Sequence, residues 1–409
     1  MKIGILGHGF IEWGGGLDFL RLICGSLASA APEAELHLLL PTKGPRLAAR
    51  EALRAVKRGL KRAIGLPAIR AKTPDVRHIA ELIKGSATTL YAHEIDAGLG
   101  AIEAAARRLQ LDVVLPCVQP MRGSQLPWIG YIADFQHTHL PHFFSADEIA
   151  RRDANFADML KSAACVIVNA EAVAADIAAF SPDCRAKIVA LPFSAAPNPQ
   201  WLQADEAPLA KYDITAPYFI ISNQFWQHKD HRCAYRAFAQ LTRQHQDVQL
   251  VCTGETSDFR NPDHFKQLCE EARLLGIESR LKVLGLIPKR EQIALMKQAV
   301  AVVQPTLFEG GPGGGSVFDA VALGIPAIVS DVAVNREIRE DTVFFFEAGN
   351  ADSLAMAMAE QLRNPVKVRK TTAELISAGL ARRQACGKAL LRACTAVQEA
   401  MGPSANLKS

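Results

Sequence analysis

Short apolar segments alternate with longer segments of helical periodicity along most of the chain. The apolar segments are mostly four to six residues long, and they form two series, one within residues 3–191 and one within residues 218–346. The segments of the first series begin at Ile3, Glu35, Val113, Trp128, Cys165 and Ile188, and those of the second begin at Tyr218, Gln249, Leu281, Ala301, Ala327 and Val343. Continuous apolar runs of this length are typical of parallel strands, because helices cover both faces of a parallel sheet. The pattern predicts two α/β domains, each built around a doubly wound parallel sheet.

A proline-rich segment separates the two series. Three prolines fall within residues 192–199, and a polar stretch follows as far as Pro217. Proline interrupts both helices and strands, so this segment is the predicted linker. The chain is long enough for two or three domains, and the pattern requires only two. The predicted division is a first domain over 1–195, a linker over 196–216, a second domain over 217–385, and a helical tail over 386–409 that returns toward the first domain.

The charge and cysteine content argue against several classes of protein. Lys and Arg total 46 against 42 Asp and Glu, and a net charge of +4 does not make nucleic acid the expected partner. The nine cysteines are odd in number and never form a C-x-x-C pair, which argues against a zinc site or a disulfide framework. The first residues do not resemble a signal peptide, and no apolar stretch approaches the roughly 18 residues that span a bilayer. We therefore expect a cytoplasmic protein.

Positive charge is concentrated in one block, residues 43–72. If residues 46–64 form a helix, four arginines at four-residue steps from Arg46 to Arg58 lie along one face, and aliphatic side chains lie on another. Such a basic amphipathic helix can lie on an anionic membrane surface, which predicts peripheral attachment at the inner face of a membrane. The alternatives are a surface helix with a solvated basic face and a contact with an acidic glycan or diphospholipid.

A glycine cluster follows the first apolar run. Gly14, Gly15 and Gly16 precede a segment of helical periodicity that begins at Leu17. Glycines between a strand and a helix N-terminus let the backbone approach a phosphate or a sugar, with free N–H groups pointing at it. Glu12 stands where a dinucleotide-binding fingerprint needs its third glycine, which argues against a nicotinamide cofactor. The alternative is a tight turn without a ligand.

The strongest functional signal is a second, denser glycine loop. Five glycines fall within residues 310–315, between an apolar run that ends at Pro305 and a helical segment that ends at Gly324. So many glycines indicate unusual backbone dihedrals or the close approach of a ligand. The positive end of the following helix can face a diphosphate, and the carboxylates of Glu309 and Asp319 can accept hydrogen bonds from sugar hydroxyls. A mobile hinge is the alternative.

This region resembles the donor-site signature of retaining glycosyltransferase family four, through Glu309, the glycines, residues 319–331 and Asn335-Arg-Glu-Ile. Members of that family have the GT-B fold, in which two Rossmann-like domains face each other across a cleft. Two glutamates separated by seven residues flank the family's loop. The resemblance implies that Glu309 lies beside the transferred sugar and that Asp319, which follows after nine residues and replaces the second glutamate, binds the ribose. We interpret the longer spacing as an enlargement of the loop by two residues.

The resemblance extends over most of the chain. Lys229 matches the family's basic residue that touches the donor diphosphate, and Asn223 can add a neutral hydrogen bond nearby. In the first domain, Ala133 occupies the usual histidine position before Asp134, so His137 or His139 is expected to take that role near the reacting centre. The sequence contains no Asp-x-Asp motif, which agrees with a mechanism that uses no metal.

The resemblance implies a hexosyltransferase. It would move a hexose from a nucleotide-diphosphate sugar, GDP- or UDP-linked and with mannose among the candidates, to a glycan or lipid-linked acceptor with retention at the anomeric carbon. Biosynthesis of surface polysaccharide, of O-antigen or capsule type, is the expected setting. The alternatives are a nucleotide-sugar epimerase or a phosphorylase on the same fold, and a catalytically degenerate binding subunit.

The expected site has three groups of residues and no metal. The first glycine cluster, from Gly14 to Gly16, would present the acceptor. The expected catalytic residues are Glu309, Asp134, His137 and His139. The residues expected to hold the donor are Asn223, Lys229, Gly310, Gly311, Gly313, Gly314, Gly315, Ser316 and Asp319.

Overall fold

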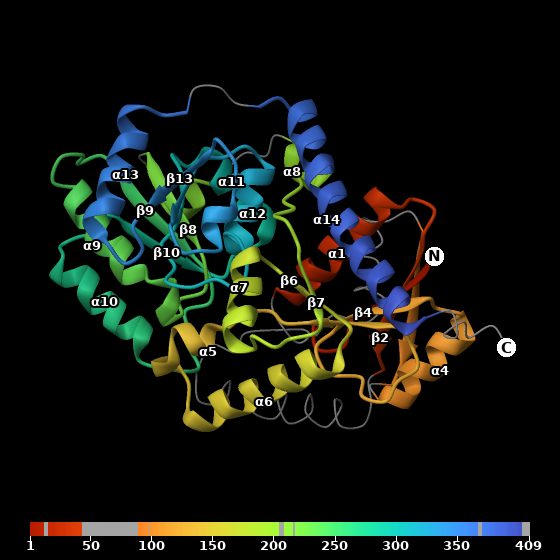
Figure 1. Cartoon of the computed structure of the whole chain (residues 1–409). Helices are drawn as coiled ribbons and strands as arrows, with labels where there is room; N and C mark the ends of the chain where they lie inside the picture. The colour runs from red at the N-terminus through yellow and green to blue at the C-terminus, as the bar shows by residue number, and fades with distance from the viewer. Residues whose placement is uncertain are drawn as a thin grey trace, which may run out of the picture.

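The computed structural model of this 409-residue chain contains two layered α/β domains and one long helix that runs from the second domain back to the first (Figure 1). The basic block of residues 43–72 and Gly14 lie outside the described residues. The structure describes residues 1–11, 15–42, 89–96, 98–203, 208–215, 217–366 and 370–402.

The first domain is built on a parallel sheet. Its described strands are β1 (Lys2–Leu6), β2 (Glu35–Pro41), β3 (Leu90–Ile95), β4 (Val113–Cys117), β5 (Trp128–Tyr131), β6 (Cys165–Val168) and β7 (Lys187–Ala190). They lie in the order β3-β2-β1-β4-β5-β6-β7, and every neighbouring pair is parallel. Strands β4, β5 and β6 are buried along their whole length, as expected for apolar segments with helices on both faces.

Helices cover both faces of this sheet. They are α1 (Gly16–Ala30), α4 (Leu99–Leu109), α5 (Gln136–His139), α6 (Ala146–Ser162), α7 (Glu171–Phe180) and the short helix η1 (Pro141–Phe143). On α1, Leu20, Ile23 and Leu27 recur at helical spacing and are fully buried against one face of the sheet. On the other face, Ile102 of α4, Met159 of α6 and others form a second core.

The second domain repeats the plan. Its described strands are β8 (Tyr218–Ser222), β9 (Gln249–Thr253), β10 (Leu281–Gly285), β11 (Val302–Gln304), β12 (Ala327–Ser330) and β13 (Val343–Phe346). They form a parallel sheet in the order β10-β9-β8-β11-β12-β13, with an apolar core on each face. Its helices are η3 (Gln227–Lys229), α9 (His231–Leu241), α10 (His264–Leu274), η4 (Glu278–Arg280), α11 (Lys289–Gln298), α12 (Gly314–Ala322), η5 (Asn335–Glu337) and α13 (Ala351–Arg363).

Two connections join the domains. The chain between the sheets forms the short helices α8 (Pro199–Leu202) and η2 (Ala210–Tyr212), and the last helix, α14, runs from Thr372 to Met401. The first half of α14 contacts the interdomain segment, where Arg382 Nε donates to Ala195 O over 2.6 Å. Its second half packs closely against α1, because Gly387 has no side chain to collide with Ser26 O. The predicted tail boundary at residue 386 falls inside this single helix.

The carboxyl ends of the strands of both sheets face each other. Asp134 follows β5, Asn169 follows β6, and the loop after β11 carries Gly310, which lies in contact with both of these first-domain residues. Carboxyl ends of parallel strands are where loops that bind ligands gather. The predicted fold class, two α/β domains that are each built on a parallel sheet, is confirmed.

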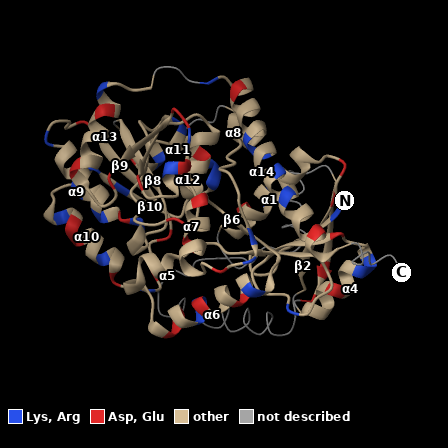
Figure 2. Ribbon diagram, viewed as in Figure 1, with Lys and Arg blue, Asp and Glu red and all other residues tan. Residues whose placement is uncertain are grey.

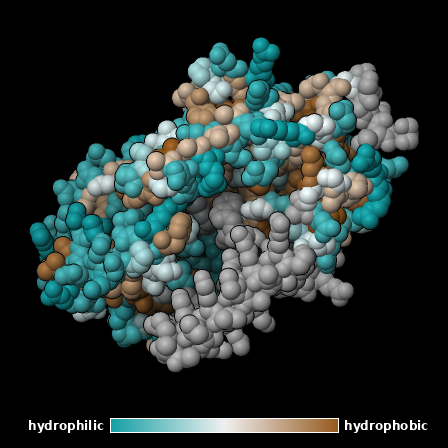
Figure 3. Space-filling view, turned by 90° about the horizontal axis from the view of Figure 1, so that it is seen from below, coloured by the Kyte–Doolittle hydropathy of each residue, from teal (hydrophilic) through white to brown (hydrophobic). Residues whose placement is uncertain are grey.

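Charged residues of both signs are interspersed over the two domains (Figure 2). The described surface seen in Figure 3 is mainly hydrophilic, with apolar residues in small separate groups. Among the described helices, none combines the length and the apolar character needed to cross a bilayer.

Candidate functional site

Two buried amide side chains hold the second glycine loop. Gln304, the last residue of β11, donates from Nε2 to Glu309 Oε1 over 2.7 Å and to Gly313 O over 3.2 Å. Asn335 accepts a hydrogen bond from Gly313 N over 2.7 Å, and both amide side chains are inaccessible to solvent. These bonds hold the loop in one shape, which favours a binding loop over a hinge.

The backbone of the loop requires glycine where it enters α12. Gly313 and Gly314 have φ values of +72° and +59°, in the left-handed region that favours glycine. A methyl group on Gly313 would also lie 2.5 Å from Cβ of Val317. Gly314, Gly315 and Ser316 form the first turn of α12, and the N–H groups of a first turn have no partners within the helix.

Lys229 and Glu309 form an ion pair at the start of this loop, where Glu309 directly precedes Gly310. Lys229 Nζ lies 2.5 Å from Glu309 Oε1, and the two side chains are only 12% and 10% exposed. The same carboxylate oxygen also accepts the bond from Gln304. Lys229, which was predicted to bind the donor, and Glu309, which was predicted to be catalytic, lie 80 positions apart in the chain and are in direct contact.

Asn223 and Ser316 join this cluster through Gln304. Asn223 Nδ2 and Ser316 Oγ both donate to Gln304 Oε1. The carboxyl ends of β8 and β11 and the start of α12 thus meet at one buried amide group. Gln304 was not predicted from the sequence, although a glutamine at the end of an otherwise apolar strand was a visible signal.

Asp319 lies on the buried side of α12. Its carboxylate is paired with Lys289 Nζ, at the start of α11, and the residue is 8% exposed. Burial raises the pKa of Asp319, the positive charge of Lys289 opposes this shift, and the negative charge of Asp18 on α1 adds to it. A ribose bound by Asp319 would have to share the carboxylate with Lys289, which was not among the predicted site residues.

The first domain contacts the loop closely at Gly310 and Gly311. A methyl group on Gly310 would lie 3.1 Å from Asp134 Oδ2, and one on Gly311 would lie 2.9 Å from Cβ of Asn169. Asn169 Nδ2 donates to Gly310 O over 3.2 Å. The predicted Asp134 is thus beside the second glycine loop. Asn169 was not predicted, because its position depends on the contact between domains.

The two candidate histidines have different surroundings. The His137 side chain is completely buried, with Nε2 2.9 Å from Asp153 Oδ1 and its ring packed between phenylalanines. His139 is about half exposed, its ring centroid lies 5.5 Å from that of Phe308, and its Nε2 lies 2.9 Å from Asp176 Oδ1. Of the two, His139 is the one that is accessible to solvent and contacts Phe308, just before the second glycine loop.

The described part of the first glycine cluster forms the start of α1. Gly15 is its N-cap residue, and a methyl group on Gly16 would lie 2.0 Å from Phe10 O. Phe10 packs on Tyr131, whose hydroxyl group accepts a hydrogen bond from Asn169 Nδ2 over 2.9 Å. Gly16 therefore has a clear packing function, and the turn before α1 is connected to the domain contact at Asn169.

This arrangement of two Rossmann-like domains with a site at their facing strand ends is the GT-B fold. Residues 209–380 match the family model of glycosyl transferases group 1. This match covers most of the second domain, and over that part of the chain it confirms the family resemblance predicted from the sequence. No match was found among curated proteins.

Solved structures with the same fold align over nearly the whole chain. Sucrose-phosphate synthase from Thermosynechococcus elongatus is 15% identical, with a TM-score of 0.60, and the alignment covers 100% of this chain and 96% of that one. The Anabaena protein HepE in complex with UDP and glucose is 15% identical, with a TM-score of 0.59 and 96% and 98% coverage. A glycosyltransferase from Rickettsia africae is 14% identical, with a TM-score of 0.59 and 98% coverage of both chains.

Proposed function

We propose that this protein transfers a hexose from a nucleotide-diphosphate sugar to a glycan or lipid-linked acceptor, with retention at the anomeric carbon. The observation that carries the proposal is the Lys229–Glu309 pair at the mouth of a glycine loop that opens α12. The similar HepE structure, which holds UDP and glucose, supports a nucleotide-sugar donor. Among such donors, a UDP-linked sugar is our first choice. GDP-linked donors, including GDP-mannose, are the second choice.

The donor diphosphate would bind to the free amides at the start of α12 and to the Lys229 ammonium group. Both carry positive charge, and the diphosphate gains negative charge as it leaves the sugar. This chain supplies that stabilisation through its own residues, so we propose a reaction without a metal. Because Lys229 is paired with Glu309 before the donor arrives, the diphosphate would replace the carboxylate as the partner of the ammonium group.

Glu309, once released, would accept hydrogen bonds from hydroxyls of the transferred sugar. In the reaction the bond between the anomeric carbon and the diphosphate oxygen breaks, and a bond from the acceptor oxygen forms on the same face. The acceptor proton passes to the departing diphosphate oxygen. Asp134 and His139, which line the first-domain side of the loop, would orient the acceptor.

The proposed setting is surface polysaccharide biosynthesis at the cytoplasmic face of a membrane. A lipopolysaccharide outer core galactosyltransferase, WaaB, is among the similar structures, at 16% identity and a TM-score of 0.57. By its name that enzyme acts on the lipopolysaccharide outer core, which supports a glycan or lipid-linked acceptor for this protein. Attachment through residues 43–72 remains part of the proposal.

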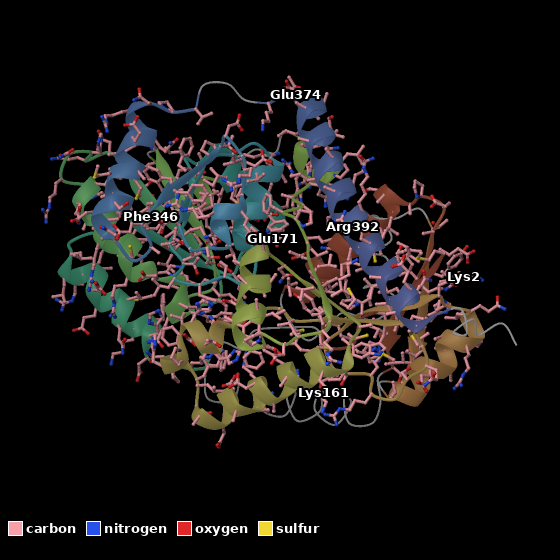
Figure 4. The ribbon with its side chains drawn as sticks, viewed as in Figure 1. Lys2, Lys161, Glu171, Phe346, Glu374 and Arg392 are labelled. Carbon is pink, nitrogen blue, oxygen red and sulfur yellow. The ribbon has the colours of Figure 1, made fainter. Side chains whose placement is uncertain are left out.

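The first test is a thermal-shift screen of the full-length protein with UDP- and GDP-linked hexoses, because a ligand that binds the folded state raises Tm. A selective donor is then used to measure release of nucleoside diphosphate in wild type, Lys229→Ala and Glu309→Ala. Exposed Lys161 on α6 supplies a matched control, Lys161→Ala (Figure 4). We expect both site variants to lose most activity and the control to keep it.

Three outcomes would contradict the proposal. Near-normal activity in both site variants would refute the site assignment. Conversion of the nucleotide sugar into another nucleotide sugar without an acceptor would indicate an epimerase. Absence of binding to every nucleoside diphosphate in isothermal titration would indicate a degenerate binding subunit.

A further inference from the structure

Helix α7 of the first domain begins without a cap from its own sequence. The residue before its first turn is Ala170, which has no side-chain oxygen to accept from the free amides of the helix. Serine, threonine, aspartate or asparagine usually occupies this position, since the first N–H groups of a helix have no partner within it.

The second domain supplies the missing cap. Glu337, at the end of η5, accepts hydrogen bonds from Glu171 N over 3.0 Å and from Ala172 N over 2.8 Å. Each carboxylate oxygen takes one bond, and the negative charge lies at the positive end of α7, which is a favourable position for it. Figure 4 labels Glu171 at the end of α7 that faces the second domain.

The same short turn also holds the donor loop. Two residues before Glu337, Asn335 accepts the bond from Gly313 N and donates to Ser330 O over 2.9 Å. Asn335 is fully buried, so η5 is fixed to the second domain by these bonds. One turn of chain therefore joins the glycine loop to α7.

A second contact lies at the other end of the glycine loop. Asn169, immediately before the start of α7, donates from Nδ2 to Gly310 O and also to Tyr131 Oη and Ala133 O. The junction of β6 and α7 thus contacts the glycine loop directly at Gly310 and, through η5, at Gly313. We call Asn169, the start of α7, Asn335 and Glu337 the interdomain latch.

We propose that Glu337 is a positioning residue that couples the approach of the two domains to the shape of the donor loop. With the cap in place, Asn335 and Asn169 hold the loop at both ends. By reciprocity, a donor seated in the loop stabilises the capped arrangement, and loss of the cap weakens donor binding. The expected effect on donor binding rests on the proposed function. The expected effect on the separation of the domains does not depend on it.

Other contacts limit the expected effect. The Arg260 guanidinium group of the second domain lies 4.6 Å from the centroid of the Phe144 ring, and His139 contacts Phe308. These contacts remain when the cap is lost. Loss of the cap should therefore increase the separation of the domains to a limited extent, and it should not change the fold of either domain. When only part of the enzyme population has the domains in the capped arrangement, the apparent Kd for the donor rises in inverse proportion to that part.

The test compares Glu337→Ala and Glu337→Gln with Arg336→Ala. Arg336 lies in the same turn, but its side chain is exposed and pairs with Asp331 inside the second domain, so it is a matched control. Small-angle scattering of the ligand-free proteins measures the separation of the domains, and thermal unfolding verifies that each variant folds.

We expect Glu337→Ala to increase the radius of gyration, to raise the KM for the donor about tenfold, as two lost charge-assisted bonds allow, and to change kcat at saturating donor much less. Glu337→Gln, which keeps one acceptor oxygen, should recover part of both effects, and Arg336→Ala should show neither. Equal scattering and equal KM in Glu337→Ala and Arg336→Ala would overturn the proposal. If the wild type binds no nucleotide sugar, the proposed function fails, while the scattering comparison still decides on the latch.

Discussion

Replacing Gln304 with leucine should remove the side-chain hydrogen bonds that hold the glycine loop of residues 310–315, while leaving the volume of the core almost unchanged. Gln304 is completely buried and holds Glu309, Gly313 and Asn223 through its single amide group. Leucine fills a similar space but can neither donate nor accept. The change therefore removes the hydrogen bonds and leaves several buried polar partners without them.

The size of the effect follows from those bonds. The bond to the Glu309 carboxylate is charge-assisted and contributes about 1.5–3 kcal/mol, and each of the bonds to Gly313 and Asn223 contributes about 0.5–1.5 kcal/mol. Leucine regains about 1 kcal/mol through apolar burial. The expected loss of unfolding free energy is about 2–5 kcal/mol, and each kcal/mol lowers Tm by about 2–4 °C in a domain of this size.

A glutamine in the same domain provides the control. Gln361 on α13 is 3% exposed, and within the described part of the structure its Oε1 atom has no hydrogen-bond partner. Gln361→Leu should be neutral or slightly stabilising, because an unsatisfied buried oxygen is removed. Calorimetry of both variants, together with titration of the donor nucleotide, measures the difference. If Gln304→Leu unfolds at the same temperature as Gln361→Leu and binds nucleotide as the wild type does, the account of the loop is wrong.

Three further outcomes are expected. His139→Ala should lower turnover with little change in Tm. His137→Ala should lower Tm, because the lost side chain leaves a cavity and removes a hydrogen bond, at a cost of about 2–3 kcal/mol in the free energy of unfolding. Kinetics and calorimetry distinguish the two variants. Lys289→Met should destabilise the fold most near pH 7 and approach the wild type near pH 4. The pKa of Asp319 is raised by burial, so ionisation of Asp319 lowers the free energy of unfolding as pH rises above the ordinary carboxyl pKa. The positive charge of Lys289 reduces this loss of stability, and the loss is larger when Lys289 is absent. Tm measured against pH tests the sign. Gly311→Ala should raise the donor KM, since its methyl group would collide with the first domain, and an unchanged KM would show that the domains do not need this close contact.

The apolar pattern located the strands because a parallel strand covered on both faces must be apolar throughout. It located all described strands except β3. Among the described strands, β3 lies at the edge of the sheet and has β2 as its one neighbour, and most of its side chains are at least partly exposed. Its residues, Leu-Tyr-Ala-His-Glu-Ile, consequently contain no continuous apolar run. The predicted basic helix within residues 43–72 stays a prediction.

The donor loop could be found in the sequence because its chemistry is local. Dense glycine, a flanking glutamate and a following helix lie within one short segment, and the need for glycine at a positive φ, as at Gly313, is visible without knowledge of any distant partner. The histidines show the limit of such reasoning. His137 and His139 are two residues apart on α5, and only packing decides that one is buried beside Asp153 and the other faces Phe308.

By itself, therefore, the sequence determined the fold class, which follows from hydrophobic periodicity, and the glycine loop of residues 310–315, which follows from the conformational needs of adjacent residues. The motifs around that loop carried the family resemblance, which the match over residues 209–380 supports. Only the tertiary structure decided the pairing of Lys229 with Glu309 and the cap that Glu337 places on α7. The partners in these contacts lie 80 or more positions apart. The Lys229–Glu309 pair depends on the neighbouring positions of β8 and β11 in the second sheet, and the cap depends on how the two domains approach each other. No pattern along a single segment of chain contains either arrangement.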